Sequence, residues 1–119
     1  FPHGDTASIG VGSMQKGFSL RTAVTDLRKH TGLTDCETVR TEGAPIPLKP
    51  LRRWDNGRDV LLAGDAAGVV APASGEGIYY AMEAGRLVAE ATEARLAGAP
   101  ASVLKQARKR FMKAHGRVF

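Results

Sequence analysis

The pattern of apolar residues divides the chain into short elements of different kinds. Alternation of apolar and small residues over residues 7–13 predicts a strand with one buried face. Apolar residues then recur at helical spacing, which predicts a helix capped by Ser19 and ended by Gly32. Residues 36–42 are predicted as a further strand. The two prolines within residues 43–48 require an extended segment that belongs to no helix or central strand.

A different pattern follows in the second half of the chain. An Asp-Asn-Gly turn signal at residues 55–57 precedes an unbroken apolar run, residues 60–63, which predicts a strand buried on both faces. Residues 75–97 are rich in good helix formers and are followed by glycine and proline, so they predict the longest helix. A final helix is predicted to begin after Ser102 as its cap. Its apolar stripe consists of Leu104, Ala107, Phe111 and Ala114.

These elements predict an α/β fold that extends beyond this chain. A strand buried on both faces needs parallel neighbours, and the 119 residues contain no second strand of comparable character. The sequence also begins at Phe1 and not at a methionine. We therefore expect the chain to be the C-terminal portion of a larger protein.

Charge changes this picture only at the C-terminal end. The chain has 17 Lys and Arg against 12 Asp and Glu, and the excess falls in residues 101–119, which contain no acidic residue. A nucleic-acid-binding domain normally spreads its basic face over the fold, so no nucleic-acid partner is expected. The single Cys36 and the scattered histidines argue against a disulfide and a metal site. No uncharged stretch approaches the roughly 20 residues of a membrane-spanning helix.

The strongest indication of a binding site is Gly64-Asp65 at the end of the apolar run. Ligands bind outside the carboxyl ends of strands in open α/β sheets, and an ionised aspartate accepts hydrogen bonds from ligand hydroxyls. A loop with Pro72 and Gly75 follows, and the long helix is expected to begin near Gly77. Small residues allow close approach of a flat ligand, and a helix start offers free N–H groups. The alternative is that Asp65 only caps backbone groups at a turn.

This stretch resembles the second FAD-binding motif of flavoproteins of the p-hydroxybenzoate hydroxylase type, and it is most similar to the geranylgeranyl reductase family. The matching elements are Gly-Asp-Ala-Ala-Gly at residues 64–68, Pro72, Gly-Glu-Gly-Ile-Tyr-Tyr-Ala-Met at 75–82, and Gly85-Arg86. Three further matches lie near the N-terminus: Phe-Pro-x-Gly-Asp at 1–5, Gly-Val-Gly at 10–12 and Lys-Gly-Phe at 16–18. The resemblance covers nearly the whole chain and is greatest to members of the chlorophyll and bacteriochlorophyll pathways.

The resemblance implies a two-domain flavoprotein. Residues 1–50 would belong to the substrate-domain sheet and its connecting helix, and residues 51–119 would form the C-terminal part of a Rossmann-like FAD domain. The resemblance further implies that NADPH reduces the flavin, which then saturates double bonds of a geranylgeranyl chain. The family's Gly-x-Gly-x-x-Gly motif is absent, so the ADP-binding half would lie upstream, and the fragment alone is expected to be inactive.

The same resemblance assigns the cofactor site residue by residue. Asp65 would bind the ribityl hydroxyls of FAD, and Gly77 and Ile78 would meet the ribityl or isoalloxazine region through backbone groups. Gly64 would allow the turn, and Pro72 and Gly75 would shape the wall near the ring. No catalytic proton donor is assigned. A cytoplasmic location is expected, with the basic terminal helix as a candidate contact with an anionic, photosynthetic membrane surface.

Two other functions fit parts of the sequence. An FAD-dependent aromatic or isoprenoid-quinone monooxygenase of the same fold would share Asp65 and the glycines but would use oxygen. A basic helical interaction module would rest on residues 101–119 alone. Product analysis separates the first alternative, and salt-sensitive nucleic-acid binding by the chain would support the second.

Overall fold

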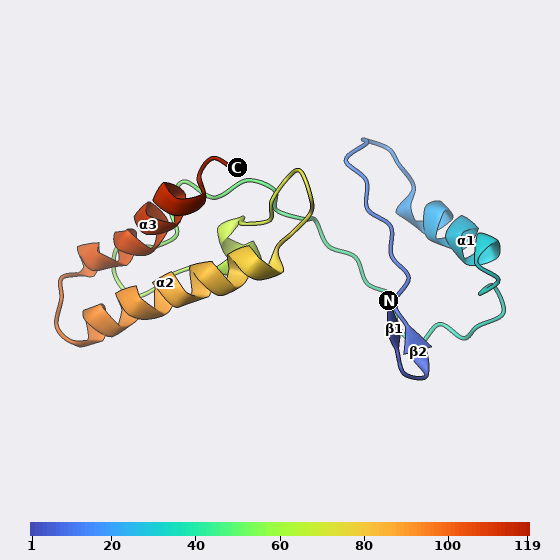
Figure 1. Cartoon of the computed structure of the whole chain (residues 1–119), viewed down its shortest axis with the longest axis horizontal. Helices are drawn as coiled ribbons and strands as arrows, with labels where there is room; N and C mark the ends of the chain where they lie inside the picture. The colour runs from blue at the N-terminus through green and yellow to red at the C-terminus, as the bar shows by residue number, and fades with distance from the viewer. The chain divides into compact units, whose positions relative to one another are not determined.

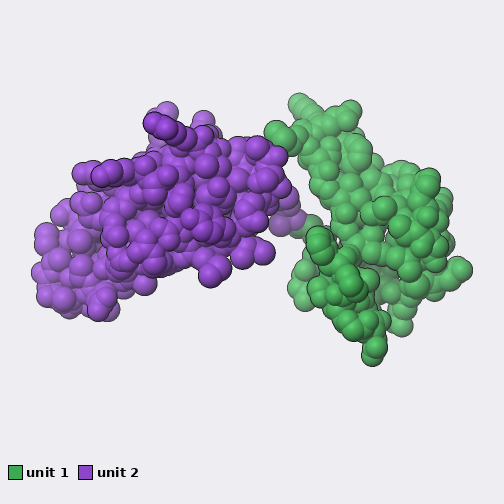
Figure 2. Space-filling view, viewed as in Figure 1, with its two compact units in different colours: residues 1–43 green, residues 44–119 purple.

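The computed structural model describes all 119 residues, which form two compact units. Unit 1 comprises Phe1–Gly43 and unit 2 comprises Ala44–Phe119 (Figure 2). Helices and a two-stranded sheet are both present (Figure 1), which confirms the predicted mixture of α and β structure. The assignment of residues 1–50 and 51–119 to a substrate domain and an FAD domain stays a prediction.

Unit 1 contains a small hairpin and one helix. Strands β1 (Pro2–His3) and β2 (Thr6–Ala7) pair antiparallel. Helix α1 covers Leu20–His30, and the Ser19 hydroxyl accepts a hydrogen bond from the Thr22 amide at 3.2 Å. Gly32 follows the helix with a φ of +70°, a conformation that favours glycine. The predicted helix and both of its ends are therefore confirmed.

The two predicted strands of unit 1 are largely wrong. Within residues 7–13 only Ala7 is in a strand, and residues 36–42 form none. Ser8 exchanges hydrogen bonds with Phe1, but no extended segment pairs with residues 9–13, so the ladder ends there. Residues near position 36 instead accept hydrogen bonds from Arg28, whose guanidinium donates to the Cys36 carbonyl and the Thr38 hydroxyl.

Unit 2 is built around its longest helix. Helix α2 (Ile78–Leu96) packs against α3 (Lys105–His115) and against two short 3₁₀ helices, η1 (Gly64–Ala67) and η2 (Ala101–Leu104) (Figure 1). A long helix after a Gly-rich loop was predicted, although it begins at Ile78 and not at residue 75. No helix in the structure combines the length and apolar character that crossing a membrane requires.

The core of unit 2 joins residues far apart in the sequence. The rings of Trp54 and Phe111 are both fully buried, and their centroids lie 5.1 Å apart. Small side chains of α2 let α3 approach closely, because an alanine occupies little space at a helix crossing. The buried cluster consists of Trp54, Ala67, Val69, Ala84, Leu87, Ala91, Ala107 and Phe111.

The predicted strand at residues 60–63 is wrong. Only Leu61 makes a bridge, an antiparallel one to Asp55, and Val60 is 50% exposed. A strand buried on both faces requires neighbours on each side, and this chain supplies none. The turn before it is confirmed, since the Asn56 side-chain oxygen accepts from the amides of Arg58, Asp59 and Val60 at 2.9–3.0 Å.

The start of the last helix also differs from the prediction. Ser102 lies inside η2 and does not cap α3, whose N-cap position is Leu104 without a side-chain hydrogen bond. Pro100 is extended and occupies the N-cap position of the 3₁₀ turn, which begins at Ala101, one residue before the serine. Of the predicted stripe, Leu104, Ala107 and Phe111 are buried, whereas Ala114 is exposed.

Candidate functional site

Asp65 lies in the short 3₁₀ helix η1, between a glycine and the first residues of the buried loop. Gly64 takes a φ of +57°, and the Asp65 carbonyl accepts a hydrogen bond from the Gly68 amide at 2.9 Å. The turn is thus closed by backbone groups alone. The Asp65 carboxylate is exposed and accepts no hydrogen bond within the chain, which argues against the alternative that it caps backbone. Its acceptor capacity is left for a ligand.

The segment before Trp54 holds this turn in place. The Leu51 amide donates to the Ala67 carbonyl at 2.9 Å, and the Val70 amide reaches the Pro47 carbonyl at 3.4 Å. Gly68 packs directly on this segment, because a Cβ built on it would lie 2.2 Å from the Lys49 carbonyl oxygen. Because the prolines keep residues 45–50 out of helices and strands, the backbone groups of this segment are free to hydrogen-bond the Asp65 turn and hold it in place.

A pocket of about 350 Å³ opens beside the Asp65 carboxylate. It brings together four of the six predicted site residues, contributed by η1, the following loop and the first turn of α2. Apart from the carboxylate its wall is apolar or glycine, which suits a flat ligand with hydroxyl groups. The lining residues are Ile46, Asp65, Val70, Gly75, Gly77, Ile78 and Ala81.

The two other predicted residues lie outside this wall. Gly64 packs against α2, since a Cβ on it would lie 3.4 Å from the Ala81 Cβ. Pro72 is exposed and does not line the pocket. The sequence did not reveal Ile46 or Val70 as wall residues. Val70 is the buried middle residue of a Val-Val-Ala run, and Ile46 lies between two prolines, so neither has a sequence pattern that indicates a pocket wall.

The start of α2 faces the same pocket. The Glu76 carboxylate accepts a hydrogen bond from the Tyr79 amide at 2.9 Å, which satisfies one N–H of the first turn. Glu76 therefore stabilises the start of the helix. The backbone amides of Gly77 and Ile78 make no hydrogen bond in the structure. They are therefore free to donate to an electron-rich group held in the pocket.

Charged side chains on the outer faces of α2 and α3 form a network apart from the pocket. The Arg86 guanidinium hydrogen-bonds Glu83 and lowers the pKa of that carboxyl, and Arg110 does the same for Glu90. Because Arg110 lies on α3 and Glu90 on α2, this pair joins the two helices. The network stabilises the frame on which the pocket is built and contributes no wall residue.

The chain is similar to curated reductases over its whole length. It is 60% identical over all 119 residues to a geranylgeranyl diphosphate reductase of Rhodobacter capsulatus, of which it covers 30%. It is 35% identical over 121 aligned residues, again the whole chain, to the chloroplastic geranylgeranyl diphosphate reductase of Oryza sativa, of which it covers 26%. It is 31% identical over 96 residues, 76% of the chain, to a digeranylgeranylglycerophospholipid reductase of Methanocaldococcus jannaschii, of which it covers 24%.

The chain therefore spans less than a third of the length of the relatives it matches. No family model matches it, and no solved structure matches it. The similarity at 60% identity extends from the first residue to the last, so it includes both units and every residue of the pocket.

Proposed function

This chain is homologous to the geranylgeranyl diphosphate reductases, and we propose that it forms part of an FAD-dependent reductase that saturates double bonds of a geranylgeranyl chain. NADPH is the proposed reductant, and the substrate is geranylgeranyl diphosphate or a geranylgeranylated pigment. Because the chain covers 30% of its Rhodobacter relative, the missing upstream part of the same protein would supply the ADP-binding half of the cofactor site. We call the protein that carries this segment the full-length reductase.

The single observation that carries the proposal is the pocket beside Asp65. Its carboxylate is unpaired and exposed, and the free amides of Gly77 and Ile78 belong to the same wall. A flavin has both features that this wall can recognise: hydroxyl groups along the ribityl chain and an electron-rich edge of the ring. Gly77 keeps the wall open, since a Cβ there would lie only 3.3 Å from the Val70 Cγ2 atom. The residues present therefore fit the proposed group.

Each side chain has a defined part in this proposal. When bound, FAD supplies the hydride-transfer chemistry, and the protein supplies position and electrostatics. Asp65 accepts from ribityl hydroxyls and fixes the orientation of the cofactor. The amides of Gly77 and Ile78, at the positive end of α2, stabilise negative charge on the adjacent group. Ile46 and Val70 give the pocket an apolar side.

Flavin retention tests the assignment of Asp65. In the full-length reductase, Asp65→Ala should raise the Kd for FAD roughly 10- to 150-fold, because a hydrogen bond to a charged group contributes about 1.5–3 kcal/mol. Asp65→Asn should keep part of the affinity, since the amide oxygen still accepts. Asp26→Ala is the matched control, because that exposed carboxylate lies in α1 and makes no side-chain hydrogen bond. An unchanged Kd in Asp65→Ala would refute the assignment.

Product analysis tests the reaction itself. We expect NADPH oxidation coupled to a more saturated isoprenoid chain in the full-length reductase. A hydroxylated product formed with consumption of oxygen would instead select the monooxygenase alternative, which uses the same pocket. The names of the relatives favour reduction, as each is a reductase of an isoprenoid compound.

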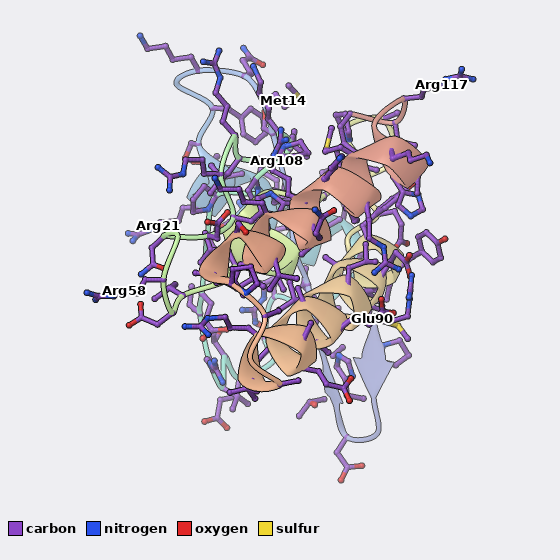
Figure 3. All side chains as sticks on the ribbon, turned by 90° about the vertical axis from the view of Figure 1, so that its left-hand side faces the viewer. Met14, Arg21, Arg58, Glu90, Arg108 and Arg117 are labelled. Carbon is purple, nitrogen blue, oxygen red and sulfur yellow. The ribbon has the colours of Figure 1, made fainter.

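We further propose that this chain touches an anionic membrane surface. The side chains of Lys109, Lys113 and Arg117 are exposed, and none takes part in an ion pair. Arg117 extends away from the ribbon at the end of the chain (Figure 3). Lysine and arginine near such a surface contribute up to about 1 kcal/mol each. A surface contact of this kind would suit an enzyme whose substrate carries a water-insoluble chain.

A further inference from the structure

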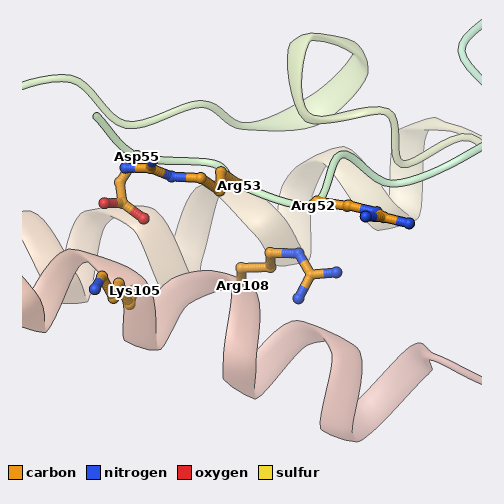
Figure 4. Close-up of a pocket in the computed structure, with 5 residues that line it drawn as sticks. All are labelled: Arg52, Arg53, Asp55, Lys105 and Arg108. Carbon is orange, nitrogen blue, oxygen red and sulfur yellow. The ribbon is translucent and has the colours of Figure 1, made fainter. Parts of the chain in front are cut away.

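A second hollow in unit 2 differs in character from the pocket beside Asp65. It has a volume of about 490 Å³ and shares no lining residue with that pocket. Four of its five lining residues are cationic. Figure 4 shows that two of them come from the segment before the buried tryptophan and two from α3. The lining residues are Arg52, Arg53, Asp55, Lys105 and Arg108.

The positive charge of this hollow is not neutralised within the chain. None of the four cations lies within 4.0 Å of a carboxylate. The one acidic lining residue, Asp55, is already engaged, because its Oδ1 accepts from the Gly57 amide at 2.9 Å and shapes the turn. Elsewhere in unit 2 exposed arginines do find partners, as Arg86 and Arg110 show. Like charges held together repel, so the arrangement favours a bound anion.

One hydrogen bond ties the two segments that line the hollow to each other. The Nε–H of Arg108 donates to the Leu51 carbonyl at 2.8 Å and ties α3 to the segment that carries Arg52. The two terminal nitrogens of Arg108 make no hydrogen bond, so they remain free for a ligand. Lys105 and Arg108 are three residues apart on α3 and therefore share a face of the helix.

The hollow also rests on the rigid core. Trp54, between Arg53 and Asp55, is 1% exposed and packs on Phe111. On α3, the buried Ala107 precedes Arg108. The backbones that carry the cations are therefore fixed before any ligand arrives. A preorganised site loses less entropy on binding than one whose side chains and backbone must first be ordered.

We propose that this hollow binds a phosphate-bearing anion, a diphosphate group in particular. Guanidinium groups match the geometry of phosphate oxygens and bind them bidentately, and a lysine adds a compact positive charge. Four cations against one engaged carboxylate suit a ligand with several negative charges better than a single carboxylate. Two sources offer this chemistry: a free diphosphate ligand and the phosphate headgroup of a lipid.

Inorganic pyrophosphate and vesicles test the proposal and separate its two sources. In the full-length reductase, Arg52→Gln/Arg108→Gln should weaken binding of pyrophosphate, or of phosphatidylglycerol vesicles, at least tenfold in titrations at fixed salt. Loss toward pyrophosphate identifies a free ligand, and loss toward vesicles alone identifies a lipid headgroup. Arg58→Gln/Arg95→Gln removes the same charge from exposed positions outside the hollow and should change neither titration.

Two results would overturn the proposal. One is that the unaltered protein binds neither pyrophosphate nor vesicles. The other is that both double variants lose binding equally, which would show that net charge alone, and not this hollow, accounts for the binding. Bound flavin, measured by its absorbance in every variant, reports on the pocket beside Asp65 and not on this hollow. A failure of the flavin proposal and a failure of the anion site are therefore distinguishable.

Discussion

Gly68 and Lys49 are so close that a Cβ on the glycine would lie 2.2 Å from the lysine carbonyl oxygen. The φ of Gly68 is +79°, so its backbone conformation also favours glycine. This contact presses the Asp65 turn against residues 47–51, which the Leu51 amide secures with its hydrogen bond to Ala67. The position of the Asp65 carboxylate therefore depends on a glycine that never touches the pocket.

Gly68→Ala should destabilise the protein by more than about 2 kcal/mol, because the left-handed conformation alone costs alanine about 1–2 kcal/mol and the methyl group meets a carbonyl. Gly98→Ala is the control, since Gly98 has a φ of +98° but nothing within 4 Å of its Cβ position. Urea unfolding gives the free energy of unfolding of both variants, and the difference between them is the cost of the steric contact. Equal destabilisation of the two would contradict the close contact.

Gly77→Ala should weaken flavin binding without a backbone penalty. The new Cβ would lie 3.3 Å from Val70 Cγ2 and 3.7 Å from Asp65 Oδ1, so it narrows the proposed pocket. Its φ of −117° is open to any residue. Gly85→Ala, also at α2, is the control: nothing lies within 4 Å of its Cβ position, and it should stabilise the helix by about 0.5–1 kcal/mol. FAD titration and thermal unfolding of both variants measure the two effects. If both variants bind FAD equally well, Gly77 is not part of a cofactor wall.

The Arg86 network should make stability depend on pH in the acidic range. Hydrogen bonding to Arg86 lowers the pKa of Glu83 below its ordinary value of 4.5, and Arg110 acts likewise on Glu90. A carboxyl with a depressed folded-state pKa stabilises above its unfolded pKa, and this stabilisation is lost as pH falls through the folded value. Arg86→Gln should therefore lower the unfolding midpoint near neutral pH, and the difference should close below pH 4.5. Arg95 has no carboxylate partner, so Arg95→Gln should show no difference in unfolding midpoint that disappears at acidic pH.

Local signals were sufficient where the sequence prediction succeeded. Ser19 caps α1 and Gly32 follows it because a hydroxyl and a free φ act on neighbouring residues only. The turn at residues 55–57 formed for the same reason. Of the site, the resemblance assigned Asp65, Gly77 and Ile78 to one cofactor. All three line the same pocket, and the cofactor itself stays a prediction.

The features that the sequence did not predict depend on contacts between residues far apart in the chain. The strand predicted at residues 60–63 depends on neighbours that this chain does not contain, so the apolar run alone could not form one. The wall residue Ile46 reaches the pocket only because the prolines direct residues 45–50 past the Asp65 turn. The anion hollow joins Arg52 to Arg108 across the sequence, and no local pattern reveals such a pair.

The 119-residue chain alone should expose apolar surface and bind FAD weakly. Ile78, Met82 and Leu96 of α2 are 76%, 72% and 84% exposed, which is unusual for large apolar side chains on one helix. We expect the isolated chain to bind a hydrophobic dye strongly, to unfold with low cooperativity and to purify without flavin. The full-length reductase should bind little dye at the same concentration. A yellow, cooperatively unfolding preparation of the chain would contradict the proposal that its partners lie in the rest of the protein.

The proposed membrane contact predicts a charge-dependent association that is separate from the anion hollow. Replacing Lys109, Lys113 and Arg117 with Gln should release the full-length reductase from phosphatidylglycerol vesicles at moderate salt, because three surface charges contribute up to about 3 kcal/mol together. Pyrophosphate binding and flavin content should stay unchanged, since none of the three lines either cavity. Co-sedimentation over a range of salt concentrations measures the release. Binding that ignores both salt and these substitutions would leave these side chains as an ordinary solvated face of α3 and its C-terminal end, with no role in locating the enzyme.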